Sequence, residues 1–125
     1  MRKWTTEDSA ELYNINSWGK GYFTINAQGH LTVTPKEGGP EIDAISLMEE
    51  LQGHDISAPV LLRFPDILNN RIEKISKCFE HAAEEHSYTG NRYIIYPIKV
   101  NQMRPVVEEL VNHDPKYKVG LEAGS

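Results

Sequence analysis

Lys99 draws attention because it follows directly on an apolar run. Residues 94–102 read IIYPIKVNQ, so a stretch typical of a buried strand leads through Pro97 to a lysine and then to two amides. An amine held in such a place is partly desolvated, which lowers its pKa and makes it a nucleophile toward carbonyl carbons. The alternative is an ordinary solvated lysine at a strand end, since lysine is usually exposed. The residue types alone leave both interpretations open.

Two further charged side chains lie near the ends of apolar runs. Glu122 closes the run YKVGLE at 117–122, and a carboxylate near Lys99 would favour the protonated amine. The alternative interpretation of Glu122 is an ordinary acid at a strand end. Arg63 lies within VLLRF at 60–64 and needs a partner in such surroundings. We expect a structural ion pair for Arg63 rather than a contact with a ligand.

The cysteine and histidine content argues against other chemistries. Cys78, the single cysteine, lies beside the apolar stripe of a predicted helix, and we interpret it as a packed thiol. One cysteine cannot form an internal disulfide, which fits a reducing compartment. Five histidines are scattered, and His81 and His86 are too far apart to share a helix face as a ligand pair. We therefore expect no metal site in this chain.

Alternating elements would position Lys99 and Glu122. Strand-like runs at 60–64, 92–97 and 117–122 are separated by two helical patterns. This order predicts a parallel sheet with right-handed crossovers, and such sheets bind ligands at the carboxyl ends of their strands. Lys99 and Glu122 each follow or close one of these strands. We therefore expect both at one ligand-binding edge.

The two helices between these strands have clear signals. The first is predicted from Pro65 to about His86, and its apolar stripe repeats at helical spacing. The second is predicted to have Pro105 at its first position. The stripe of the first helix comprises Leu68, Ile72, Ile75, Phe79 and Ala82.

The residues before this alternation have a different pattern. Residues 1–17 are polar with scattered apolar anchors, and we interpret them as an arm. The alternating runs YFTI and HLTV flank residues 26–29, which predicts a β-hairpin that needs a further sheet to join. Residues 35–41 are a predicted loop. A short helix should follow, capped by Ser46 with Glu49 in a capping box, and should end at Gly53.

Length and charge exclude several classes of protein. The chain has 125 residues, whereas a complete (β/α)8 barrel takes roughly 250. The net charge of −5 argues against a general nucleic-acid binder and gives no reason to expect membranes as partners. No apolar run reaches the ~20 residues of a membrane span. We expect a soluble, cytoplasmic protein whose sheet remains incomplete after three strands.

The segment Tyr-Pro-Ile-Lys-Val-Asn-Gln at 96–102 resembles the cofactor-lysine motif of the biosynthetic arginine decarboxylases. These are pyridoxal-phosphate enzymes with an alanine-racemase-like barrel, and the related ornithine and diaminopimelate decarboxylases carry a similar Tyr-x-x-Lys-x-Asn pattern. Pro-Ile before the lysine and Gln after the asparagine favour the arginine enzymes. Similar segments follow in the same order across the chain, at 18–23, 26–30, 59–68 and 120–125.

The resemblance implies an α/β fold, the start of a (β/α)8 TIM barrel of the alanine-racemase-like, type III pyridoxal-phosphate class. Residues 1–41 would be an arm and hairpin that contribute to a β-domain, and residues 42–125 the first β/α units. Lys99 would be the catalytic Schiff-base lysine, and Glu122 would lie beside it at the cofactor. Family members are several times longer, so their phosphate-binding and substrate-binding residues are expected beyond Ser125.

The same resemblance implies an activity. The complete enzyme would convert L-arginine to agmatine and CO2 for polyamine biosynthesis, as a homo-oligomer, with pyridoxal phosphate and, by resemblance, Mg²⁺. We expect this 125-residue chain alone to be inactive. Two alternatives stay open. One is another decarboxylase, for ornithine or diaminopimelate, or a racemase of the same barrel class. The other is a non-enzymatic α/β interaction module whose lysine is a surface residue.

Overall fold

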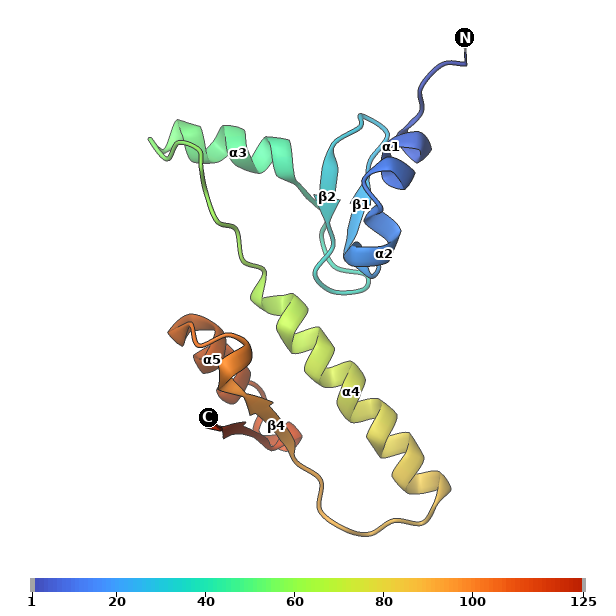
Figure 1. The fold of residues 1–125 in the computed structure, drawn as a ribbon, viewed down its shortest axis with the longest axis vertical. Coiled ribbons are helices and arrows are strands. Elements are labelled where there is room, and N and C mark those ends of the chain that lie inside the picture. Colours follow the sequence, from blue (N-terminus) through green and yellow to red (C-terminus); the bar gives the residue numbers. More distant parts are fainter. Residues whose placement is uncertain (1, 125) are drawn as a thin grey trace. The chain divides into compact units, whose positions relative to one another are not determined.

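A computed structural model describes residues 2–124 and shows two compact units, Met1–Arg63 and Phe64–Ser125. Helices and strands occur in both units, which confirms the mixed α/β class (Figure 1). The predicted boundary between a β-domain and a barrel, at residue 41, is a different division and stays a prediction. None of the described helices combines the length and the apolar character needed to span a membrane.

The first unit begins with two short helices that contact strand β1. Helix α1, Thr6–Leu12, has a capping box between Thr5 and Asp8. Helix α2, Ile15–Gly19, follows directly, so the predicted arm is largely helical. Figure 1 shows both helices beside strand β1. The buried apolar residues of this unit are Ile15, Tyr22 and Val33.

The predicted hairpin is confirmed. Strand β1, Phe23–Ile25, pairs antiparallel with β2, Leu31–Val33. Asn26 shapes the connection, because its Oδ1 accepts the backbone N–H groups of Gln28 and His30 at 3.1 and 2.9 Å. A short third strand, β3 (Ile42–Asp43), pairs with β2, so the hairpin has the partner strand that its stability requires.

Helix α3, Ala44–Gly53, ends where the sequence predicts but begins earlier. The predicted cap at Ser46 is wrong, because Asp43 caps the helix instead. Asp43 Oδ1 accepts the backbone N–H groups of Ile45 and Ser46 at 2.9 and 3.1 Å. The Ser46 N–H is thus one of the donors that the cap satisfies, and Ser46 lies inside the helix.

The second unit contains a long helix and a parallel pair of strands. Helix α4, Pro65–Glu85, confirms the predicted helix within one residue. Strand β4, Ile94–Pro97, pairs in parallel with β5, Val119–Glu122. Helix α5, Arg104–Val111, connects them, and its first residue is Arg104 rather than Pro105. The core comprises Ile72, Leu110 and Tyr117, with Leu68, Ile94, Tyr96, Val106 and Val119 packed against them.

The strand predicted at 60–64 is wrong for this structure. Among the described residues, the parallel sheet contains only β4 and β5, and residues 60–64 form no strand. A strand exists only where its backbone pairs with a neighbour, and an apolar run alone does not supply that neighbour. The observed order of this unit is therefore α-β-α-β rather than β-α-β-α-β.

The apolar stripe of α4 is packed at only part of its length. The buried residues of the helix, Asn70, Ile72 and Ser76, lie in its first two-thirds. Further along, the Phe79 side chain is 61% exposed and Cys78 is exposed. The prediction of a packed Cys78 thiol is wrong, because the core of this unit covers the face around Ile72 and Ser76 and not the side on which Cys78 lies.

Candidate functional site

Lys99 lies on a single turn of 3-10 helix, Ile98–Val100, which follows β4 without an intervening residue. Its side chain is exposed. Interpreting Lys99 as a nucleophile predicts partial burial instead. The sheet beside it has two strands, so few side chains surround the turn. The amine is therefore accessible to a small molecule at the carboxyl end of β4.

The turn that carries Lys99 is bonded at both ends. The Tyr96 hydroxyl donates to the backbone carbonyl of Asn101 at 3.3 Å. Asn101 Oδ1 in turn accepts the backbone N–H of Met103, the N-cap residue of α5, at 3.0 Å. Composition and spacing alone assign no role to Tyr96 or Asn101. Their fixed spacing around the lysine, Tyr-x-x-Lys-x-Asn, is the signal that could have identified them.

Glu122 lies at the same edge of the sheet as the Lys99 turn. In the parallel register, Pro97 is the partner of Glu122, so the last residues of β4 and β5 are side by side. Both charged side chains are exposed, and they form no ion pair in the described part of the chain. The Glu122 carboxylate instead lies against Gly124, so close that a Cβ added to this glycine would overlap Glu122 Oε1. The structure thus brings the two strand ends together but not the two charges.

The other residues singled out in the sequence lie elsewhere. Arg63 is exposed in the strand-free segment before α4. His81 pairs with Glu85 at 3.7 Å on the surface of α4. Among the described residues, no three potential ligands gather as a metal site would require.

Two other lysines near the strands are held by partners. Lys118 Nζ donates to Asn91 Oδ1 at 2.9 Å and lies over the Tyr93 ring. Lys116 Nζ lies 3.1 Å from Asp114 Oδ2. Hydrogen bonds to Tyr117 and then to Asp114 raise the pKa of Lys116, so its amine stays protonated and is a poor nucleophile. Lys99 is the candidate that position favours, because it is exposed and follows the carboxyl end of β4.

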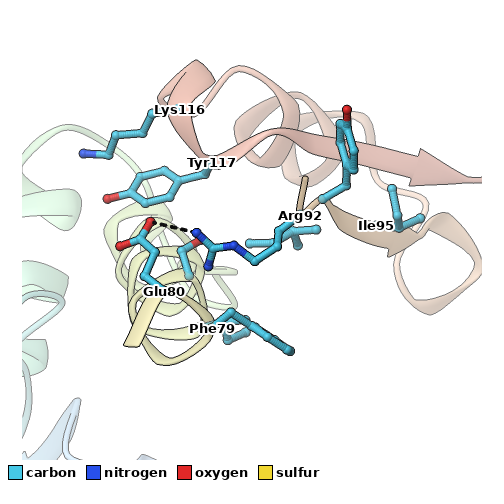
Figure 2. A pocket seen from close by; sticks show the side chains of 10 residues that line it. Phe79, Glu80, Arg92, Ile95, Lys116 and Tyr117 are labelled. Atoms are coloured by element: carbon cyan, nitrogen blue, oxygen red, sulfur yellow. Dashed lines mark ion pairs between the residues drawn. The ribbon is translucent and has the colours of Figure 1, made fainter. Parts of the chain in front are cut away.

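A cavity of about 400 Å³ lies in the same unit but away from Lys99. Figure 2 shows its floor on α4, where Glu80 faces Arg92 across an ion pair of 4.0 Å. Arg92 precedes β4, whereas Lys99 follows it, so the cavity opens near the opposite end of the strand. Its other lining residues are Ile75, Ser76, Phe79, Tyr93, Ile94, Ile95, Lys116 and Tyr117.

Comparisons with known proteins give one consistent result. No family model matches the chain. The biosynthetic arginine decarboxylases of Phocaeicola vulgatus and Bacteroides thetaiotaomicron are 60% and 61% identical to it over 125 residues. That of Gloeobacter violaceus is 48% identical. Each match includes all of this chain and 20% of the relative, so the chain spans about a fifth of their length.

A solved structure agrees. The crystal structure of the biosynthetic arginine decarboxylase SpeA from Campylobacter jejuni matches with a TM-score of 0.75 and 37% identity. The match covers 90% of this chain and 19% of that one. Identity at this level, together with a shared fold, reflects common ancestry. Over its whole length, the chain is homologous to a segment of the biosynthetic arginine decarboxylases.

Proposed function

We propose that this chain is the segment of an arginine decarboxylase that anchors pyridoxal phosphate, with Lys99 as the anchoring residue. The observation that carries the proposal is the position of Lys99, on an exposed turn at the carboxyl end of a parallel strand. Whole-length similarity to proteins named as biosynthetic arginine decarboxylases supports it. The reaction would convert L-arginine to agmatine and CO2.

The residues at this edge fit one end of the cofactor. The aldehyde of pyridoxal phosphate needs a primary amine within reach, and Lys99 supplies an accessible one. Glu122 ends the neighbouring strand at the same edge of the sheet, where its carboxylate would lie beside the cofactor. When bound, the cofactor supplies the electron sink that allows loss of a carboxylate. The part of this chain is to hold the amine in place.

The remaining parts of the proposal concern the longer protein. By similarity, residues 1–41 would join a β-domain and residues 42–125 would open a (β/α)8 barrel, with β4 and β5 as two of its strands. The enzyme would be a cytoplasmic homo-oligomer of polyamine biosynthesis, with Mg²⁺ as an assisting ion by resemblance. The net charge of −5 gives no reason to expect nucleic acid or membrane as a partner.

The anchor is testable in a chimera in which this chain replaces the matching segment of the Bacteroides thetaiotaomicron relative, to which it is 61% identical. Borohydride reduction in the presence of pyridoxal phosphate, followed by peptide mapping, should place the label on Lys99. Lys99→Ala should abolish the label, and Lys118→Ala should retain it. A label on Lys116 or Lys118 in the unsubstituted chimera, or no label on any lysine, would contradict the proposal.

A further inference from the structure

We infer that Tyr96 is a positioning residue for Lys99, whose hydroxyl closes the turn that presents the amine. The inference rests on the proposed function of Lys99. It assigns to the hydroxyl of Tyr96 a role that the packing of its ring does not explain.

The Tyr96 side chain has two separate environments. Its ring is half-buried and packs against the core that contains Ile72, Leu110 and Tyr117. Its hydroxyl extends from the core and bonds the Asn101 carbonyl, five residues further along the chain, at 3.3 Å. Because packing immobilises the ring, its hydroxyl can hold Asn101, the residue that follows the Lys99 turn.

Asn101 extends this attachment to the next helix. Its Oδ1 accepts the Met103 N–H at 3.0 Å, and α5 begins at the following residue. Helix α5 contributes Leu110 to the same core. Both ends of the turn are therefore tied to one packed structure, while the Lys99 side chain itself is exposed.

A fixed turn matters because the lysine side chain is long and flexible. Fixing the backbone beneath the amine reduces the number of positions that Nζ samples, and rates of bond formation depend steeply on such placement. The hydroxyl is not required to fill the core, since phenylalanine has the same ring. Removing the oxygen alone should loosen the turn and leave the packing intact.

The experiment uses the chimera described above, without cofactor, and compares Tyr96→Phe with Tyr93→Phe. Tyr93 precedes the same strand, at the end away from Lys99, and is 64% exposed. After addition of pyridoxal phosphate, attachment to Lys99 is followed by visible absorbance. We expect attachment about tenfold slower in Tyr96→Phe and unchanged in Tyr93→Phe. Amide hydrogen exchange should accelerate in residues 98–103 of Tyr96→Phe before any cofactor is added.

The outcomes separate this inference from the proposal on which it rests. If the unsubstituted chimera is not labelled at Lys99, the proposed function fails. If it is labelled there and Tyr96→Phe attaches the cofactor at the unsubstituted rate, the inference alone is overturned. Faster exchange in residues 106–111 of helix α5 in Tyr96→Phe would show that the hydroxyl supports the whole unit, and that result also overturns a positioning role.

Discussion

Asp43 shows how a single side chain can connect separate elements. Its Oδ1 caps α3, while its Oδ2 accepts a bond from Asn26 Nδ2 and lies 2.8 Å from His30 Nδ1. Partial desolvation raises the pKa of Asp43, but the bonds from Ser46, His30, Asn26 and Ile45 outweigh it, and the net pKa is lowered. The ionised carboxylate is therefore the form that holds the hairpin turn to the helix.

This lowered pKa sets a direction for the dependence of stability on pH. A carboxyl whose pKa is lower in the folded state stabilises that state above its unfolded pKa of about 3.9. The contribution is lost as pH falls through the folded pKa. Asp43→Asn should therefore lower the urea midpoint at neutral pH, and the difference from the unsubstituted chain should shrink as the solution becomes acidic.

Tryptophan fluorescence is a suitable measurement, because Trp4 and Trp18 both lie in the first unit. Asp55→Asn is the control, since Asp55 is exposed and its left-handed backbone, with φ of 62°, accepts asparagine. A loss from Asp43→Asn that is equally large at neutral and acidic pH would show that the charge of Asp43 is not its source.

At the scale of elements, helix α4 shows what a periodic pattern can and cannot establish. The spacing of apolar residues predicted its length within one residue. The same pattern placed Ile72, Ile75 and Phe79 on one packed face, yet Ile72 is 5% exposed and Ile75 is 43% exposed. Periodicity identifies the side of a helix that is apolar, but the neighbouring elements decide how much of that side they cover.

The difference between these two isoleucines is measurable. Ile72→Ala should lower the free energy of unfolding of the second unit by about 3 kcal/mol, because it opens a cavity in the core. Ile75→Ala, the matched control on the same helix, should cost about 0.5 kcal/mol. Helical circular dichroism during denaturation reports the loss, while tryptophan fluorescence from the first unit should not change. Equal costs at the two positions would contradict the assigned core.

The candidate site, like helix α4, was predictable from the sequence only in part. The sequence placed Lys99 and Glu122 at the carboxyl ends of two strands, and the parallel register of β4 and β5 confirms that placement. It missed the bond from Tyr96 to Asn101, because no pattern of polarity reports where a hydroxyl points. The strand predicted at 60–64 failed for a related reason, since pairing depends on partners that a local run of residues does not specify.

At the scale of the whole molecule, the chain is short compared with its relatives. The chain corresponds to a fifth of the length of its curated relatives, and its parallel sheet has two strands within the described residues. Catalysis of decarboxylation requires groups that surround the reacting carbon and exclude water. The exposed amine proposed as the anchor, at one sheet edge, would supply only an attachment point.

We therefore expect the isolated 125-residue chain to release CO2 from arginine no faster than pyridoxal phosphate mixed with a short lysine peptide. The chimera should exceed the release without cofactor or protein by at least about 10⁶-fold, as enzymes typically do. Carbon dioxide release measures both proteins under the same conditions. Turnover by the isolated chain at a rate similar to that of the chimera would contradict the prediction.

The bond between Tyr96 and Asn101 also has a consequence for the order of folding. It joins residues only five apart, whereas the pairing of β4 with β5 joins residues 25 apart, such as Ile94 and Val119. Short loops close on a timescale of about 10–100 ns, and the entropy cost of closure rises with loop length. During synthesis, the turn around Lys99 can thus form before β5 has left the ribosome, and it becomes fixed when Leu110 and Tyr117 pack against the Tyr96 ring.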